Sequence, residues 1–397
     1  MSLNQTASGE RVHIGFFGKR NAGKSSLVNA VTGQELSVVS DVAGTTTDPV
    51  KKAMELFPVG PVLITDTPGF DDIGTLGEKR VEKTLRILAS TDLAVMVVDG
   101  IVGFTPEDEE MLAQIKKRGT PHTVVYTKSD VASPKVTHEG LSVSSANGNG
   151  IEELKKLLGS LSAKKEEKFI LKDLVSPGDT VLLVIPVDAS APKGRLILPQ
   201  QQTLRELLDL HCIPLCCQDT EVKQTLSLLK TPPKLVITDS QAFGKVSKDI
   251  PEEIMLTSFS ILFARYKGDL VSLVKGAAAL KGLKDGDKVL IAEGCTHHRQ
   301  CGDIGSVKMP KWIEGYTGVK PQYVFASGND FPVDLSQFSL VVHCGGCMLN
   351  ETEMAHRLSV ASEQGIPMVN YGVAIACMHG ILKRSLQPFP AVLSLLD

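Results

Sequence analysis

The stretch that decides the fold of the N-terminal region is "GKRNAGKS", residues 18–25. It follows the apolar run "VHIGFFG" (12–18) and fits G-x-x-x-x-G-K-[ST] at every position. A buried strand that runs into a glycine-rich loop and then a helix presents backbone N–H groups and a positive helix end to a phosphate. In this pattern Lys24 reaches the β- and γ-phosphates, and the Ser25 hydroxyl binds Mg²⁺. The sequence therefore predicts an α/β nucleotide-binding domain of the P-loop type.

The segments that follow indicate guanine as the base. The strand in "LITDTPG" (63–69) ends at an aspartate placed to hold Mg²⁺ through water, and the last glycine can sense the γ-phosphate. In "TKSD" (127–130), Asp130 can accept from two guanine N–H groups that adenine does not offer together. "SSANGNG" (144–150) adds backbone contacts to the guanine carbonyl, and "AGTTTD" (43–48) lies where a first switch is expected. The predicted nucleotide-binding residues are Asn21, Ala22, Gly23, Lys24, Ser25, Ser26, Thr46, Asp66, Gly69, Thr127, Lys128, Asp130, Ser145 and Ala146; Lys24, Thr46 and Asp66 are the predicted catalytic residues.

Over about residues 10–162 these motifs resemble the translation-factor-like GTPases grouped with tRNA-modifying and ribosome-assembly G proteins. The resemblance implies that Thr46 is the switch threonine on Mg²⁺, with Thr45 and Thr47 as alternatives. The base motif normally begins with Asn, so Thr127 predicts looser nucleotide binding.

The residue after the D-x-x-G motif is also unusual. Phe70 stands where Ras-type enzymes carry a glutamine that orients water. In the resembling group an asparagine of the phosphate loop can hold K⁺, and Asn21 occupies that position. We therefore expect slow hydrolysis that K⁺ accelerates; the alternative for Asn21 is an ordinary turn residue.

Composition limits the possible partners. A chain of 397 residues predicts two or three domains. A net charge of -3 and an aromatic content of 5% give no reason to expect nucleic acid or an anionic membrane. The apolar runs have strand length, and the N-terminus lacks a signal peptide, which predicts a soluble, cytoplasmic protein. Eight cysteines in that compartment indicate metal or redox chemistry.

Beyond the first domain the pattern changes. A helix is expected over 151–162 and a charged linker over 163–168. Short apolar strands then alternate with helices, which predicts two smaller parallel-sheet α/β domains, at 169–265 and 266–397. The first carries no catalytic motif and suits a dimerisation or interaction role. We expect the three cysteines of "HCIPLCC" (211–217) to be packed in a buried strand.

The C-terminal domain holds the second chemical feature. Cys295 follows the strand "VLIAEG", and Cys344 and Cys347 lie in "HCGGC" (343–347) after "FSLVV". The carboxyl ends of parallel strands meet at one edge of a sheet, so the three thiols can converge. We expect the helix that follows to favour the thiolates through its dipole, and the two glycines between the cysteines to leave room for a bulky ligand. A redox disulfide, a Cys₃His zinc site, plain packing and an iron–sulfur cluster all remain open.

The order of a GTPase domain, a small α/β domain and then C-x-H…H-C-x-x-C resembles the GTPase maturation factors of FeFe-hydrogenase, the HydF family. The residues that carry the likeness are Cys295, Thr296, His297, His343, Cys344, Gly345, Gly346 and Cys347. The resemblance implies a 4Fe–4S cluster on the three cysteines and a carrier for the diiron subcluster. It also implies a homodimer that works with the radical-SAM maturases HydE and HydG and delivers its product to the hydrogenase apoprotein.

Two points remain open at this stage. The fourth cluster position could fall to His297 or His343, as exchangeable ligands or as donors to sulfide, or to Cys301. The alternative for the whole protein is an RNA- or ribosome-directed GTPase with a structural zinc site. The sequence does not show how a GTP state would act on the cysteines.

Overall fold

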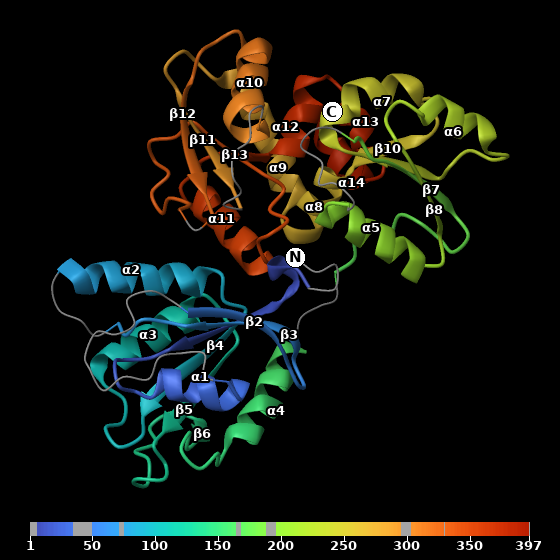
Figure 1. Cartoon of the computed structure of the whole chain (residues 1–397). Helices are drawn as coiled ribbons and strands as arrows, with labels where there is room; N and C mark the ends of the chain where they lie inside the picture. The colour runs from blue at the N-terminus through green and yellow to red at the C-terminus, as the bar shows by residue number, and fades with distance from the viewer. Residues whose placement is uncertain are drawn as a thin grey trace. The chain divides into compact units, whose positions relative to one another are not determined.

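The computed structural model (Figure 1) describes residues 6–34, 50–70, 75–163, 168–187, 196–294, 303–328 and 330–396. The chain divides into two compact units, residues 1–166 and 167–397.

A mixed sheet forms the centre of the first unit. Within the described residues its strand order is β2-β3-β1-β4-β5-β6, and β2 alone runs antiparallel to its neighbour. The strands are β1 (Val12–Phe17), β2 (Val50–Leu56), β3 (Gly60–Asp66), β4 (Leu93–Asp99), β5 (His122–Thr127) and β6 (Gly140–Ser142). The helices are α1 (Lys24–Thr32), α2 (Thr75–Ala89), α3 (Pro106–Lys117) and α4 (Ile151–Ser162).

Both faces of this sheet are covered, because its two buried cores lie on opposite sides. Successive residues of β4 alternate between the cores: Val95 belongs to one, and Ala94 and Met96 to the other. This explains why the central strands are continuously apolar. The helix expected over 151–162 is confirmed, and it buries Ile151, Leu154 and Leu158 on one face.

Two four-stranded parallel sheets form the second unit, as the sequence predicts. Within the described residues their orders are β10-β9-β7-β8 and β12-β11-β13-β14. The strands are β7 (Thr180–Val184), β8 (Ile213–Cys217), β9 (Leu235–Thr238), β10 (Met255–Ser258), β11 (Lys288–Glu293), β12 (Gln322–Ser327), β13 (Leu340–His343) and β14 (Met368–Asn370). The helices are α5 (Leu198–Asp209), α6 (Val222–Leu228), α7 (Phe243–Asp249), α8 (Phe259–Lys267), α9 (Leu270–Ala277), α10 (Met309–Thr317), α11 (Glu351–Glu363), α12 (Tyr371–Met378), α13 (Leu382–Ser385) and α14 (Pro390–Leu393).

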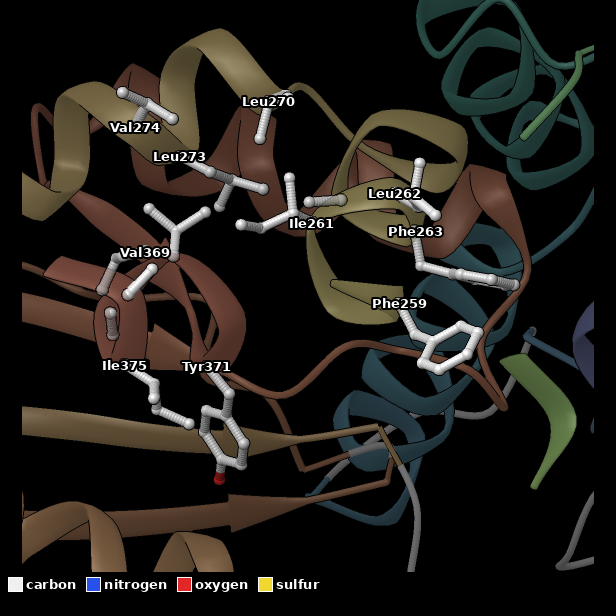
Figure 2. Close-up of a cluster of buried hydrophobic side chains, with 14 of the residues drawn as sticks. Phe259, Ile261, Leu262, Phe263, Leu270, Leu273, Val274, Val369, Tyr371 and Ile375 are labelled. Atoms are coloured by element: carbon white, nitrogen blue, oxygen red, sulfur yellow. The ribbon is translucent and has the colours of Figure 1, made fainter. Parts of the chain in front are cut away.

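A single continuous core joins these two sheets. Figure 2 shows Ile261 of α8 and Leu273 of α9 turned towards each other; Ile375 of α12 belongs to the same cluster, and all three are almost fully buried. The same cluster includes strands of both sheets, for example Val236 and Val341. The sheets therefore share helices, and the division into domains at 169–265 and 266–397 stays a prediction.

The cysteines of β8 correct one expectation. Cys212, just before the strand, is buried, but Cys216 is exposed and Cys217 is half-buried. The reason is that β8 lies at the edge of its sheet, where it pairs with β7 on one side. Among the described helices, none has the length and apolar character needed to cross a bilayer.

Candidate nucleotide site and cysteine loop

The phosphate loop ends in a helix start that points into the predicted nucleotide site. Gly23 caps α1 with φ +85°, a left-handed conformation that glycine adopts without strain. The Lys24 side chain is buried, and its ammonium donates to the Lys19 carbonyl at 2.6 Å. This bond joins the lysine to the loop that precedes it. Ser26 follows within the first turn of α1.

The predicted Mg²⁺ ligands of the loop and of β3 lie together. The Ser25 hydroxyl donates to Asp66 Oδ2 at 2.7 Å. Asp66 Oδ1 is buried and has no partner among the described residues. A hydroxyl beside an under-coordinated carboxylate suits a hard divalent cation, so these residues fit Mg²⁺. Gly69 follows two residues after the buried Thr67, whereas Thr45, Thr46 and Thr47 lie outside the described residues.

The base motif is attached to the phosphate loop through its first residue. The Thr127 hydroxyl lies 2.7 Å from the Ala22 carbonyl and 3.2 Å from that of Val98. Its side chain is 2% exposed, so these bonds form away from water. Thr127 therefore links the base motif to the loop that wraps the phosphates. This contact supplies a link between the two loops in a chain that lacks the usual asparagine. The looser nucleotide binding expected from Thr127 stays a prediction.

The rest of the base site is formed by two loops that are bonded to each other. Lys128 has φ +61° and donates to Asp99 Oδ2 at 2.6 Å. The Ser129 amide donates to the Val143 carbonyl at 3.2 Å, which ties "TKSD" to "SSANGNG". Asp130 is exposed, so its carboxylate is accessible to a ligand.

A residue that the motif reading did not single out shapes the second loop. Ser144 is fully buried, and its hydroxyl accepts from the amides of Ala146 and Asn147, each at 3.3 Å. Ser145 and Ala146 lie in this turn. The signal available in the sequence was the serine at the start of the motif, since serine hydroxyls commonly bond to the backbone two residues on.

The two positions linked to catalysis differ in exposure. Asn21 is exposed and has φ +57°, a conformation in which asparagine is enriched. Phe70 is 9% exposed and packs in one of the cores, so an apolar ring occupies the position after D-x-x-G. The backbone conformation of Asn21 is that of a turn residue, and the predicted binding of K⁺ by its side chain is not tested.

The strands that lead to the cysteines are parallel neighbours, as expected from the sequence. Ala292 of β11 pairs with His343 of β13. The Gly294 amide, just past β11, donates to Cys344 Sγ at 3.0 Å, and the Gly346 amide lies 3.4 Å from the same sulfur. Gly294, the residue that directly precedes Cys295 in the sequence, thus contacts the Cys344 sulfur. Cys295, His297 and Cys301 lie outside the described residues.

His343 is fully buried and bonded at both ring nitrogens. Nε2 lies 3.0 Å from Arg357 Nη1, and Nδ1 lies 2.7 Å from the Cys344 carbonyl. An arginine can only donate, so Nε2 accepts and the proton sits on Nδ1. Burial, reinforced by the charge of Arg357, lowers the pKa of His343 to about 3. The ring is therefore neutral and engaged with the protein.

Arg357 of α11 holds this arrangement together. Its side chain is 1% exposed, pairs with Glu353 at 2.8 Å and donates to the Gly328 carbonyl at 2.5 Å. Sequence reasoning missed Arg357. The available signal was an arginine four residues after a glutamate on an otherwise amphipathic helix, a common spacing for an ion pair.

The two cysteines precede α11, as expected, and the effect of its dipole on the thiolates stays a prediction. Asn350 caps α11, whose first residue is Glu351, so Cys344 and Cys347 lie outside the first turn. The dipole acts mainly within that turn. Burial raises the pKa of the Cys347 thiol, and the charge of Lys267 only partly opposes this.

The two glycines of the loop serve different needs. Gly346 has φ +61°, and a Cβ there would lie 2.7 Å from Met354 Sδ of α11. A Cβ on Gly345 would meet only Ser260 Oγ, at 3.8 Å. Gly346 is therefore fixed by its backbone and by packing, which differs from the expected role of leaving room for a ligand.

In the part of the chain that the structure describes, no three His, Cys, Asp or Glu side chains gather into a metal site. Neither Cys344 nor Cys347 is part of a disulfide among those residues. Their chemistry still suits a thiophilic centre, because one sulfur already accepts two backbone N–H groups and amide hydrogen bonds to sulfur are typical of such sites.

The comparisons first define the class of the N-terminal unit. Residues 13–128 match the family model described as a 50S ribosome-binding GTPase, so this unit is a GTPase domain. The chain is 35% identical over 151 residues to the tRNA modification GTPase MnmE of Synechococcus sp. (strain RCC307), covering 37% of this chain and 32% of that protein. It is 41% identical over 125 residues to the GTPase Der of Wolinella succinogenes, covering 31% of this chain and 26% of that protein.

The chain thus spans a third or less of the length of these curated relatives. Among solved structures, Aquifex aeolicus Era bound to GDP and AlF₄⁻ matches with a TM-score of 0.36 and 21% identity, covering 60% of this chain and 97% of that one.

The second unit identifies the family. Residues 170–268 match the hydrogen maturase F dimerization domain, and residues 271–388 match the hydrogen maturase F tetramerization domain. Together these two models cover more than half of the chain. The chain belongs to the HydF family of hydrogenase maturation GTPases.

Proposed function

We propose that this protein is a GTP-hydrolysing scaffold that binds a 4Fe–4S cluster and assembles or delivers the diiron subcluster of FeFe-hydrogenase. The observation that carries the proposal is the contact between the Gly294 amide and Cys344 Sγ at 3.0 Å. It brings the end of β11 to the sulfur at the end of β13, so that Cys295 needs only to follow Gly294 along the chain to join the same site.

The GTPase half rests on the residues of the phosphate loop and β3. Lys24, which donates to the Lys19 carbonyl, would bind phosphate oxygens, and Ser25 and Asp66 would hold Mg²⁺ together with Thr46. Mg²⁺ supplies charge neutralisation for phosphoryl transfer. Asp130, with the loop of Ser145 and Ala146, would select guanine. The role of Thr46 comes from the sequence motif.

The carrier half rests on Cys295, Cys344 and Cys347. Three protein thiolates leave one iron of a 4Fe–4S cluster free to exchange its ligand, which a carrier site needs. The His343 ring nitrogens already bond to Arg357 and to the Cys344 carbonyl. This arrangement favours a structural role for His343 over ligation or donation to sulfide, and it leaves His297 and Cys301 as candidates for the fourth position.

The assembly follows from the family descriptions. A dimerization model at 170–268 and a tetramerization model at 271–388 support self-association and the division of the second unit near residues 265–270. We propose a homodimer as the basic assembly, with HydE, HydG and the hydrogenase apoprotein as partners. A reducing compartment such as the cytoplasm suits the described cysteines, which form no disulfide.

The test is anaerobic reconstitution with iron and sulfide. We expect the wild-type chain to take up about four irons, and Cys295→Ser, Cys344→Ser and Cys347→Ser each to lose the cluster while hydrolysing GTP normally. Lys24→Ala should retain the cluster and lose hydrolysis. Cys216→Ser removes an exposed thiol of β8 and serves as the matched control. Iron uptake that is unchanged in all three serine variants would rule out the proposed ligands.

The role of Asn21 is tested separately with salts. We expect GTP hydrolysis to be faster in KCl than in NaCl at the same ionic strength, because Phe70 cannot orient water and a bound cation would supply the missing charge. Asn21→Ala should remove the difference between the salts. Equal rates of the wild type in both salts would leave Asn21 as a turn residue.

The alternative, an RNA- or ribosome-directed GTPase with structural zinc, is not favoured. The two hydrogen maturase F models match most of the second unit, and the net charge of -3 offers no footprint for nucleic acid.

A further inference from the structure

A lysine of α8 contacts the loop that carries Cys344 and Cys347. Lys267 lies in the last turn of α8, and its side chain is 4% exposed. Its ammonium donates to the Cys347 carbonyl at 2.9 Å and to the Leu349 carbonyl at 3.0 Å. These two acceptors flank Met348, so one buried side chain fixes the backbone immediately after the second cysteine.

The loop is held at its other end by helix capping. Asn350 is 3% exposed, and its side chain accepts from the Glu353 amide at 3.1 Å to begin α11. Lys267 therefore holds the backbone between Cys347 and the start of the helix. Without it, the buried Leu349 carbonyl and the partly buried Cys347 carbonyl would lose this donor, which destabilises the loop.

The charge of Lys267 is as notable as its hydrogen bonds. Lysine is rarely buried to this degree, since a buried ammonium must be compensated. A centre held by thiolates carries net negative charge, and a positive group nearby both favours its binding and favours its reduced form. The lysine also comes from the segment matched by the dimerization model, while the loop belongs to the tetramerization model.

We propose that Lys267 is a positioning residue for the metal centre: it fixes the loop after Cys347 and places a fixed positive charge beside the thiolates. This inference rests on the proposed metal-binding function. It makes the centre dependent on α8, which belongs to the preceding α/β segment.

The test uses the full-length chain, reduced and free of metal, and Cd²⁺ as the probe. Binding is followed by the ultraviolet thiolate-to-cadmium charge-transfer band. Lys267→Met removes charge and donor at similar length, and Lys267→Gln retains a neutral donor. Lys275→Met, which removes an exposed lysine of α9, is the control. Thermal unfolding of each variant shows whether the second unit is folded.

We expect Lys267→Met to weaken Cd²⁺ binding by about tenfold or more, a typical effect for groups that support metal ligands, and the control to stay within about twofold. If Lys267→Met does not fold, Lys267→Gln decides. In the reconstituted protein, Lys267→Gln should also shift the reduction potential of the cluster to a more negative value, because a positive charge beside the cluster favours its reduced form.

The outcomes separate this inference from the proposed function. Wild-type affinity and potential in both Lys267 variants would overturn the inference and leave the metal site standing. If the wild-type chain shows no thiolate-to-cadmium band that depends on Cys344 and Cys347, both the inference about Lys267 and the proposed metal site are overturned.

Discussion

Thr127 shows how one substitution in a motif can be absorbed by its surroundings. Its hydroxyl sits 2.7 Å from the Ala22 carbonyl, in the loop that wraps the phosphates. A second carbonyl, from Val98 at the end of β4, lies at 3.2 Å. Both acceptors are buried with it, so the hydroxyl keeps three segments in register: the phosphate loop, β4 and the base motif.

We expect Thr127→Val to weaken GDP binding by about tenfold, because the valine leaves the Ala22 carbonyl without a donor at a cost of about 1–3 kcal/mol. Thr127→Ser keeps the hydroxyl and should bind GDP nearly as the wild type does. Titration with a fluorescent GDP analogue measures both. Equal GDP affinities for the valine and serine variants would show that the hydroxyl does not contribute to nucleotide binding.

Among single residues, those that belong to a sequence motif could be predicted as candidate site residues, and those outside a motif could not. Lys24, Ser25 and Asp66 were predictable because phosphate and Mg²⁺ chemistry demands fixed residue types at fixed spacing. Arg357 and Lys267 were not, because their partners are main-chain carbonyls and a histidine brought close only by the tertiary fold.

Among the elements, the loop between β13 and α11 is the most tightly specified. Its backbone turns through a left-handed residue at Gly346, packs against Met354 of α11 and ends at the Asn350 cap. The strand before it carries the histidine that Arg357 holds. The cysteines thus lie on a turn whose shape is fixed by contacts within the protein.

The neighbouring glycines provide a matched pair of tests. We expect Gly346→Ala to destabilise the second unit by about 1–2 kcal/mol, since alanine is strained at positive φ and its Cβ would press on Met354. Gly345→Ala meets only Ser260 at 3.8 Å and should have little effect. Urea unfolding of the metal-free protein compares them. Two equally stable variants would show that the turn is not constrained as described.

The pattern of strands and helices was largely predictable, and the boundaries less so. The helix at 151–162 has the expected bounds. The run "LVSLVKGAAALKGL" (270–283) is helical in pattern throughout, but α9 ends at Ala277 and a 3₁₀ turn follows. The exposure of Cys216 could not be foreseen, because no local pattern tells an edge strand from a central one.

For the whole molecule, the sequence predicted a GTPase domain followed by parallel-sheet α/β regions, and the structure has this order. It did not show that the two smaller sheets would share one core through α8, α9 and α12 (Figure 2). Sharing of this kind depends on which helix faces meet in space. The shared core gives α8 a direct route to the cysteine loop through Lys267.

The two units also divide the chemistry. The predicted nucleotide-binding residues lie in residues 1–166, and the cysteine loop lies in residues 167–397. Each site is built from its own sheet, so loss of one is expected to leave the other intact. Coupling between them would require two states that both ligands distinguish.

The most direct test of the account is metal analysis of the chain purified without oxygen. We predict iron and acid-labile sulfide in equal amounts, about four of each per chain, and their loss in Cys344→Ser. About one zinc per chain, with no iron and no sulfide, would contradict it.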